Sequence, residues 1–75
     1  MHARPASKIA QMAASARSDV WLCANSTKVD AASIIDILTL GAVKGTTVVV
    51  EIENQEDMMI LDQIVDFFES GFGEI

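Results

Sequence analysis

Apolar and polar residues recur along the chain with two periods, and these periods predict six elements of secondary structure. Ile9, Met12, Ala13 and Ala16 recur at helical spacing and predict a first helix from about Arg4 to Ala16. The remaining elements are β-prone runs and two further helices: strands at 20–24, 27–31 and 46–52, a short helix at 34–40 and a last helix at 55–69. The order α-β-β-α-β-α favours antiparallel strands with the helices on one face, an α+β open-faced sandwich in a single domain of residues 1–75.

Capping residues fix the ends of the second and third helices. Ser33 is an N-cap candidate with Asp36 three residues on, and Gly41 is the expected stop. Asn54 is expected to cap the last helix, with Glu56-Asp57 in its first turn. That helix should bury a stripe of five apolar residues: Met58, Leu61, Ile64, Val65 and Phe68.

The short helix at 34–40 is apolar on nearly every side, so its whole surface cannot face inward. We assign Ile37 and Leu40 to the core. In the strand at 20–24, alternate residues face opposite sides of the sheet, and we place Trp21 and Cys23 on the open face near Val49. That placement gives an apolar spot consistent with self-association.

Composition and charge narrow the class of protein. The chain has 75 residues, 51% of them hydrophobic, and a single cysteine, which excludes a disulfide framework and a multi-cysteine metal site. No apolar run approaches the roughly 20 residues of a membrane-spanning helix, and the first residues contain no signal peptide. We therefore expect a soluble cytoplasmic protein without membrane insertion, cofactor or bound metal.

The charge is divided unevenly between the two parts of the chain. The net charge of −6 argues against a general nucleic-acid binder. Residues 1–28 hold four basic residues against one acidic residue, whereas residues 29–75 hold one basic residue against ten acidic ones. A basic N-terminal end suits an anionic ligand or an acidic partner, but ordinary solvated charge explains the clustering equally well.

The one histidine, His2, lies directly before the predicted first helix. Free N–H groups and the positive end of the helix dipole favour an anion there, and Arg4 adds a planar donor suited to phosphate. A neutral imidazole nitrogen is a competent nucleophile, so this chemistry allows transient phosphorylation of His2. The residues alone favour the plainer alternative of a frayed terminal histidine beside a chance arginine.

Four stretches of the sequence match motifs of one known family, at the spacing along the chain that the family has. They are His2-Ala3-Arg4-Pro5-Ala6, Ser33-Ile34-Ile35 followed by Leu38-Thr39-Leu40-Gly41, Lys44-Gly45 before a Thr/Val-rich strand, and Glu69-Ser70-Gly71-Phe72-Gly73-Glu74. Together they resemble the histidine-containing phosphocarrier (HPr) family of the bacterial phosphotransferase system, over essentially the whole chain. The resemblance implies the family's βαββαβα fold.

The resemblance also implies a function and its residues. Family members accept a phosphoryl group from enzyme I, charged by phosphoenolpyruvate, on the histidine Nδ1 and pass it to an enzyme IIA domain in sugar uptake or its regulation. By that match His2 is the carrier and Arg4 stabilises its charge. The partner-binding residues would be Ala3, Ser7, Gln11, Ile34, Ile35 and Leu38. Asp36 lies among them and would narrow the choice of partner, and Ser33 matches the serine that a dedicated kinase phosphorylates in some members.

One departure from the family is large. Members begin with a β-strand before the histidine loop, whereas this sequence starts at Met1. The family's strand order 1-4-2-3 would then lose an edge strand and leave strand 46–52 with unpaired backbone groups, which predicts pairing there, for example in a homodimer. A start upstream of Met1 is the other explanation. The alternative function is a regulatory or remnant HPr-like module that binds partners without efficient phosphotransfer.

Overall fold

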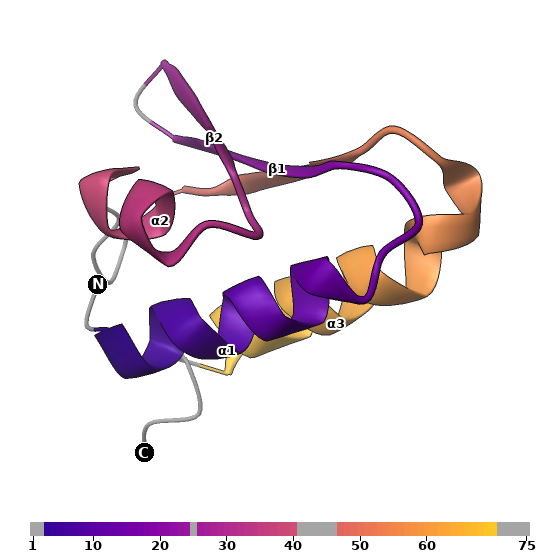
Figure 1. Ribbon diagram of the computed structural model, residues 1–75, viewed down its shortest axis with the longest axis horizontal. Coiled ribbons are helices and arrows are strands. Elements are labelled where there is room, and N and C mark those ends of the chain that lie inside the picture. The colour runs from indigo at the N-terminus through magenta and orange to yellow at the C-terminus, as the bar shows by residue number, and fades with distance from the viewer. Residues whose placement is uncertain (1–2, 25, 41–46, 71–75) are drawn as a thin grey trace.

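The computed structural model describes residues 3–24, 26–40 and 47–70, and it has the α+β architecture that the sequence predicts. The elements follow in this order (Figure 1): α1 (Ala3–Ala14), β1 (Val20–Ala24), β2 (Thr27–Asp30), α2 (Ile34–Leu40), β3 (Val49–Ile52), a short 3₁₀ turn η1 (Gln55–Asp57) and α3 (Met58–Glu69). The three strands form one antiparallel sheet in the order β2-β1-β3.

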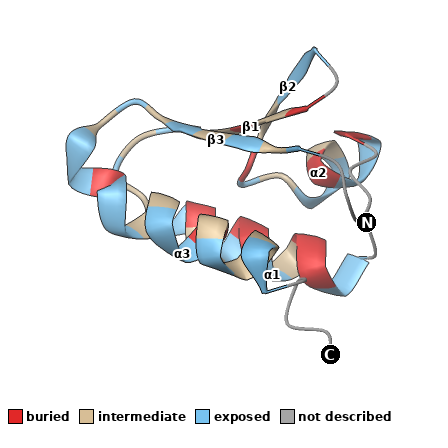
Figure 2. Ribbon diagram, turned by 180° about the vertical axis from the view of Figure 1, so that it is seen from behind, coloured by how far each residue is buried: buried red, intermediate tan, exposed pale blue. Residues whose placement is uncertain are grey.

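The sheet and the two long helices form two layers. Helices α1 and α3 pack against each other below one face of the sheet, while α2 packs against α1 and β2 (Figure 1). Figure 2 shows that the buried residues of α1 and α3 lie on the side of each helix that faces the sheet. Among the described residues, the core between the layers holds eleven buried apolar residues: Ala6, Ile9, Ala10, Ala13, Val20, Leu22, Ala24, Ala31, Ile37, Leu40 and Ile64.

Four of these core residues belong to α1, and they explain how closely that helix packs. Ala6, Ile9, Ala10 and Ala13 recur at helical spacing and are all at least nine-tenths buried. Three of the four are alanines, so the helix backbone can lie near its neighbours α2 and α3. Pro5 is also buried, in the first turn, where a proline costs no intrahelical hydrogen bond.

The two faces of the sheet are set by β1. Its residues alternate between buried and half-buried, with Val20, Leu22 and Ala24 facing the helices. The register pairs Cys23 with Val49 and Trp21 with Glu51, which confirms that Trp21 and Cys23 lie on the open face beside Val49.

Some predicted boundaries differ from the observed ones. Helix α1 begins one residue earlier than predicted and ends at Ala14, after which the N–H groups of Ser15 and Ala16 donate to carbonyls three residues back. Strand β2 ends at Asp30, and β3 begins at Val49 although the sequence predicts a strand from 46. The register explains the shorter β3: β1 ends at Ala24, so residues before Val48 run past the end of their partner strand.

The stripe predicted for α3 is partly wrong. Ile64 is fully buried, and Phe68 packs against the core as expected, but Met58 is 51% exposed. Ile60 and Phe67, which the prediction omits, pack against the core instead. The helix also starts later than predicted, since Asn54 caps η1 by accepting from the Glu56 N–H at 2.9 Å, and α3 begins only at Met58.

Several predicted features lie outside the described residues. They are His2, Asn25 of the predicted turn, the stop at Gly41, the Lys44-Gly45 pair, Thr46 and the ending from Gly71 to Glu74. Ser26, the other residue of the predicted turn, is described, and its φ of 63° lies in the left-handed region.

Candidate functional site

The N-terminal end of α1 carries the first part of the candidate site. His2 lies outside the described residues, and the helix begins at the residue that follows it, Ala3. Ala3 and Arg4 are exposed, and no carboxylate within the described part of the chain forms an ion pair with Arg4. The first-turn N–H groups have no helical partner. A positively charged guanidinium and free donors therefore adjoin the position of His2 in the sequence.

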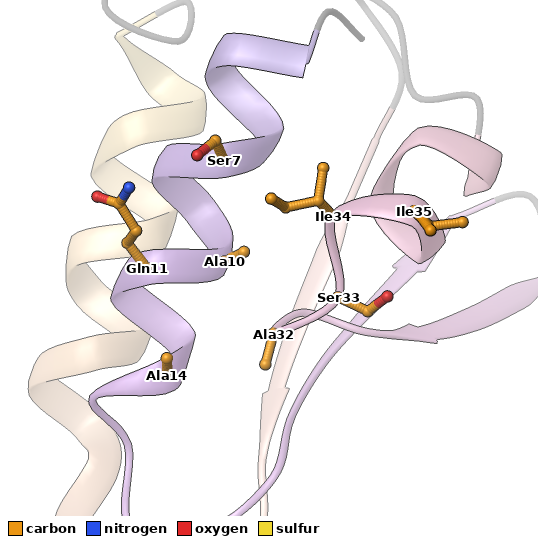
Figure 3. A pocket seen from close by; sticks show the side chains of 8 residues that line it. All are labelled: Ser7, Ala10, Gln11, Ala14, Ala32, Ser33, Ile34 and Ile35. Carbon is orange, nitrogen blue, oxygen red and sulfur yellow. The ribbon is translucent and has the colours of Figure 1, made fainter.

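The second part of the site is an open groove between α1 and the start of α2. Its volume is about 590 Å³. Figure 3 shows Ser7, Ala10, Gln11 and Ala14 on α1 along one side and the α2 residues across from them. The other side of the groove, just before and at the start of α2, is lined by Ala32, Ser33, Ile34 and Ile35. Five of the sequence-predicted residues, Ser7, Gln11, Ser33, Ile34 and Ile35, thus meet at one place.

Helix α2 divides its apolar residues between the core and the surface, as the sequence predicts. Ile37 is fully buried and Leu40 is 5% exposed, whereas Ile34, Ile35 and Leu38 are 41%, 73% and 37% exposed. Leu38 does not line the groove and lies on the exposed side of α2. We call Ile34, Ile35 and Leu38 the α2 patch. Exposed apolar side chains at a mainly apolar groove with a few polar residues are typical of a surface that docks a partner transiently.

Ser33 is the N-cap of α2, as predicted. Its hydroxyl oxygen accepts from the Asp36 N–H at 3.2 Å, and its carbonyl accepts from the Ile37 N–H at 3.0 Å. Asp36 is half-buried and sits one residue after Ile35, so the α2 patch has a carboxylate on its border. Ser33 is one of the residues that line the groove, next to Ile34, and its hydroxyl points away from α1 (Figure 3).

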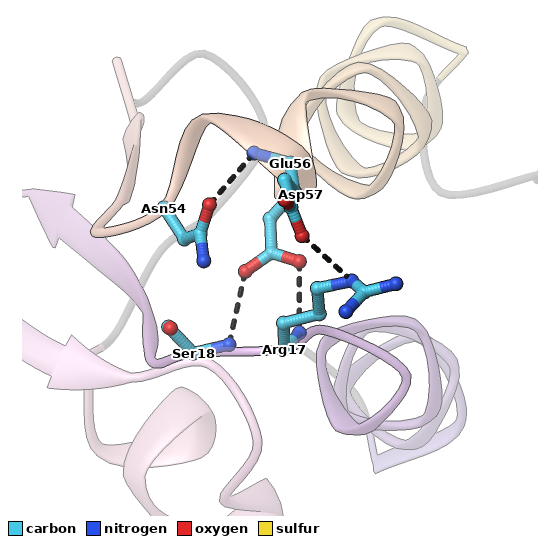
Figure 4. Close-up of polar contacts among 5 residues, drawn as sticks. All are labelled: Arg17, Ser18, Asn54, Glu56 and Asp57. Atoms are coloured by element: carbon cyan, nitrogen blue, oxygen red, sulfur yellow. Dashed lines mark hydrogen bonds and ion pairs between the residues drawn. The ribbon is translucent and has the colours of Figure 1, made fainter.

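A second polar cluster, around Asp57, is structural. The Asp57 carboxylate is 2% exposed, and its two oxygens accept from the backbone N–H groups of Arg17 at 2.8 Å and Ser18 at 3.0 Å (Figure 4). The Arg17 side chain forms an exposed ion pair with Glu56 at 3.0 Å. Because each carboxylate oxygen accepts a backbone N–H, Asp57 joins the α1–β1 connection to the start of α3, and it does not line the groove.

The open face of the sheet holds polar contacts around Trp21. Its indole N–H donates to Glu53 at 3.1 Å, and the Lys28 ammonium lies 5.0 Å from the ring centroid and pairs with Glu51 at 3.1 Å. Burial raises the pKa of the Cys23 thiol, and the nearby Glu51 carboxylate raises it further. Cys23 is therefore protonated at neutral pH and a poor nucleophile.

Comparison with known proteins identifies the family to which this chain belongs. The model of the PTS HPr component phosphorylation site matches residues 1–70. The chain belongs to the HPr family. HPr from Neisseria meningitidis is 31% identical over 99% of this chain and 83% of its own length, and HPr from Chlamydia pneumoniae is 39% identical over 100% and 69%. Both relatives are named phosphocarrier proteins, and an HPr is a carrier of the phosphotransferase system, not an enzyme.

Solved HPr structures share the fold. An HPr dimer from Thermoanaerobacter tengcongensis superposes with a TM-score of 0.86 at 36% identity, covering 99% of this chain and 85% of its own. The Bacillus subtilis catabolite-repression protein Crh, described as a dimer with a swapping domain, superposes with a TM-score of 0.85 at 28% identity, covering 93% and 80%. HPr-family membership and the α+β fold are therefore confirmed.

No helix within residues 3–24, 26–40 and 47–70 is both long and apolar enough to cross a membrane. The same ranges contain no cluster of three or more histidine, cysteine or acidic residues that could hold a metal ion.

Proposed function

We propose that this HPr-family chain accepts a phosphoryl group on His2 from enzyme I, charged by phosphoenolpyruvate, and passes it to an enzyme IIA domain. The observation that carries the proposal is the match of the phosphorylation-site model to a segment that includes His2-Ala3-Arg4-Pro5. In the transfer, the bond from phosphorus to the enzyme I donor atom breaks as a new N–P bond forms to Nδ1 of His2. The electron pair of the broken bond stays with the donor, and the lone pair of Nδ1 makes the new bond.

Arg4 and the first turn of α1 have a defined task in this proposal. The phosphorylated imidazole carries a dianion, which an exposed guanidinium and free N–H groups stabilise. Arg4 is exposed and forms no ion pair with any described residue, so it can turn toward the phosphate without breaking an existing contact. The phosphoryl group must be stabilised on His2 and yet be released easily to the next acceptor. A solvent-exposed positive charge such as that of Arg4 suits this temporary product.

The experiment that tests the carrier role is direct. The chain is incubated with enzyme I and phosphoenolpyruvate, and the phosphate bound per chain is measured by intact mass spectrometry before and after acid treatment. We expect one acid-labile phosphate, and we expect its loss when an enzyme IIA domain is added. Absence of labelling, while another HPr is labelled in the same mixture, would contradict the proposal. Labelling without discharge to enzyme IIA would contradict its second half.

We propose that enzyme I and enzyme IIA dock on the groove and the α2 patch, through Ala3, Ser7, Gln11, Ile34, Ile35 and Leu38. Support comes from their positions: five line the groove or the exposed side of α2, and Ala3 begins the helix that forms its wall. The groove walls are helices held by the core through Ile9 and Ile37, so the surface is preformed. Partners that bind a preformed surface lose little free energy to its ordering.

Replacing Ile35 with glutamate should weaken binding of both partners. Ile35 is 73% exposed, so the change costs the fold little, but it places a charge where an apolar side chain would be buried on docking. We expect the Kd for enzyme I to rise on the order of tenfold to hundredfold, as for a central interface residue. Titration calorimetry measures the change.

Met59→Glu is the matched control for that experiment. Met59 is 71% exposed, lies on α3, and gains the same charge on substitution. Its Kd should equal that of the unaltered protein. Equal weakening by both substitutions would assign the effect to net charge and contradict docking at the α2 patch.

We propose that Ser33 is a regulatory phosphorylation site for a serine kinase. Ser33 is half-buried at the mouth of the groove, and a phosphate there would remain at the start of α2 while placing negative charge beside Ile34. The modification would thus leave the helix intact and disturb the docking surface. Incubating the chain with the kinase and ATP, and measuring the phosphate bound at Ser33, would test this site directly.

Substitutions at Ser33 should separate its capping role from its effect on docking. Ser33→Ala removes the cap and should lower the free energy of unfolding by about 1 kcal/mol in thermal denaturation. Ser33→Asn and Ser33→Asp both retain a capping oxygen, but only aspartate adds a charge. We expect Ser33→Asp to raise the Kd for enzyme I several-fold relative to Ser33→Asn, and equal values would contradict regulation by charge.

A second copy of the chain is a further proposed partner, through the strand at residues 46–52, of which 47–52 are described. Its support is that two structural neighbours, an HPr and Crh, are dimers. A cytoplasmic location also remains part of the proposal, since the family's relay starts from phosphoenolpyruvate.

A further inference from the structure

Helix α2 carries one carboxylate beside the α2 patch, that of Asp36. Asp36 is half-buried and directly follows Ile35, the most exposed residue of the patch. Ile34 and Ile35 line the groove, with Ile35 farther from α1, and Asp36 does not line it (Figure 3). Because successive residues of a helix are turned by about 100° around its axis, Asp36 lies beyond Ile35 as seen from the groove. The carboxylate therefore borders the docking surface on the side away from α1.

The backbone of Asp36 is held by two hydrogen bonds, whereas its carboxylate has no partner among the described residues. The Asp36 N–H donates to the Ser33 hydroxyl oxygen at 3.2 Å, and the Asp36 carbonyl accepts from the Thr39 hydroxyl at 2.8 Å. The carboxylates of Asp30 and Asp57, by contrast, accept backbone N–H groups. Asp36 thus stands at a fixed point of the surface, with a carboxylate that can accept a donor from a partner.

Asp36 also has a structural role, because it lies in the first turn of α2. An acidic side chain there interacts favourably with the positive end of the helix dipole. This role and a role in docking are compatible, but they differ in one respect. Only the docking role depends on the charges that a partner carries, and an experiment that changes the partner can separate the two.

Docking on the α2 patch would change the surroundings of the Asp36 carboxylate. A partner that covers Ile35 also removes water from the residue that follows it. Removing water from a carboxylate is unfavourable unless a donor or an opposite charge replaces the water. A basic side chain of the partner would supply both, whereas an acidic one would be repelled. The half-buried carboxylate therefore favours one kind of partner surface over another.

The opposite wall of the groove carries the opposite charge. None of the eight residues that line the groove is charged. On α1, however, Arg4 and Lys8 are exposed, and their spacing of four residues places them on the same side of the helix. The docking surface is thus positive on its α1 side and negative on its α2 side. A partner with the complementary distribution can bind in one orientation only.

We propose that Asp36 determines the specificity of the docking surface: it selects an enzyme I that presents an arginine or lysine beside the α2 patch and disfavours one that presents a carboxylate there. The inference rests on the proposed docking of enzyme I, and it adds the charges that enzyme I carries on its side of the contact. Acidic residues of enzyme I would face Arg4 and Lys8. A charge added at Ser33, one turn before Asp36, would draw the basic side chain away from the patch, which agrees with weaker docking of Ser33→Asp.

Three substitutions at Asp36 test the charge, with the Kd for enzyme I measured by titration calorimetry. Asp36→Glu keeps the charge and should retain the Kd within about twofold. Asp36→Asn should raise the Kd about threefold to tenfold, because it removes the attraction. Asp36→Lys should raise it on the order of tenfold to hundredfold, because two positive charges then face each other. The excess of Asp36→Lys over Asp36→Asn should shrink at high salt, where charges are screened.

Asp62→Lys is the matched control for Asp36→Lys. Asp62 is exposed on α3, and the substitution changes the net charge of the chain by the same amount. Its Kd for enzyme I should equal that of the unaltered chain. Far-UV circular dichroism and thermal denaturation establish that every variant is folded at the temperature of the titration.

A charge exchange between the two proteins separates docking from a purely structural role. Each exposed arginine and lysine on the surface of enzyme I that binds this chain is replaced in turn by glutamate. One of these substitutions should weaken binding of the unaltered chain and restore binding of Asp36→Lys, as expected for two side chains in direct contact. If Asp36 only stabilised the first turn of α2, no change in enzyme I could restore that binding.

Every other outcome overturns the proposal. Equal Kd values for Asp36→Lys and Asp62→Lys exclude a role for the Asp36 charge, and a loss of binding that no enzyme I substitution reverses excludes direct pairing with a basic residue. Labelling of His2 by enzyme I is measured on the same samples. An unaltered chain that is neither bound nor labelled overturns the proposed function as well, whereas normal binding and labelling of Asp36→Lys overturns the role of Asp36 alone.

Discussion

Replacing His2 with alanine should abolish phosphate incorporation from phosphoenolpyruvate and enzyme I completely. His2 is the one histidine in the chain, and the proposed phosphoryl acceptor is its imidazole nitrogen. Alanine offers no nucleophile, burial raises the pKa of the Cys23 thiol and keeps it protonated, and the Ser33 hydroxyl oxygen is engaged in capping α2. Intact mass spectrometry should show the unmodified chain after any incubation time.

The result distinguishes a carrier from a docking module. His2→Ala retains the groove and the α2 patch, so it should still bind enzyme I with an unchanged Kd. Arg4→Ala is the second control: it should be labelled on His2, but on the order of tenfold to hundredfold more slowly, because it removes one charged donor near the phosphate. Phosphate retained by His2→Ala would place the acceptor elsewhere and contradict the proposed role.

The parts of the fold that the sequence predicts well are those fixed by neighbouring residues. The alternation in β1 places Trp21 and Cys23 on the open face without reference to the rest of the chain. Ser33 caps α2 through a contact three residues away. The α2 patch follows from a short helix that is apolar on all sides, because only part of its surface can be buried. Each of these features depends on a short segment.

The parts that the sequence misplaces depend on contacts between distant segments. The apolar spacing predicts that Met58 points inward, but Met58 is the first residue of α3 after a 3₁₀ turn, and Ile60 and Phe67 pack against the core beside Ile64 and Phe68. Asp57 ends that turn, and its carboxylate accepts from the backbone N–H groups of Arg17 and Ser18, about forty residues away in the sequence. Local helical preference explains an acidic residue near a helix start, but it cannot identify a partner on another loop.

The candidate site shows the same division. The motif around His2 is contiguous, so it can be recognised in the sequence directly. The groove brings Ser7 and Gln11 of α1 to Ser33 and Ile34 at the start of α2, and periodicity alone does not say which helices are neighbours. In the sequence, only the family resemblance connects the two segments. The packing of α1 against α2 supplies the physical reason for that connection.

Replacing Asp57 with alanine should be the most destabilising single change among the described polar residues. The carboxylate is almost fully buried, and both oxygens accept backbone N–H groups, at 2.8 and 3.0 Å (Figure 4). Removal leaves two donors without a charged acceptor and opens a small void. We expect the free energy of unfolding to fall by about 2–4 kcal/mol, since each bond to a charged group contributes strongly. For a domain of this size, that loss lowers the Tm by about 10–20 °C.

Two neighbouring substitutions give this expectation its controls. Glu56→Ala removes only the ion pair to Arg17, whose side chains are 72% and 63% exposed, and it should change the free energy of unfolding by less than about 1 kcal/mol. Asp57→Asn keeps the volume but turns one acceptor into a donor that faces a backbone N–H, so it should lose nearly as much stability as alanine. If urea denaturation gives Asp57→Ala and Glu56→Ala equal losses, the buried contacts are not what joins the α1–β1 connection to α3. If Asp57→Asn is as stable as the unaltered chain, shape and not the second accepting oxygen holds that junction.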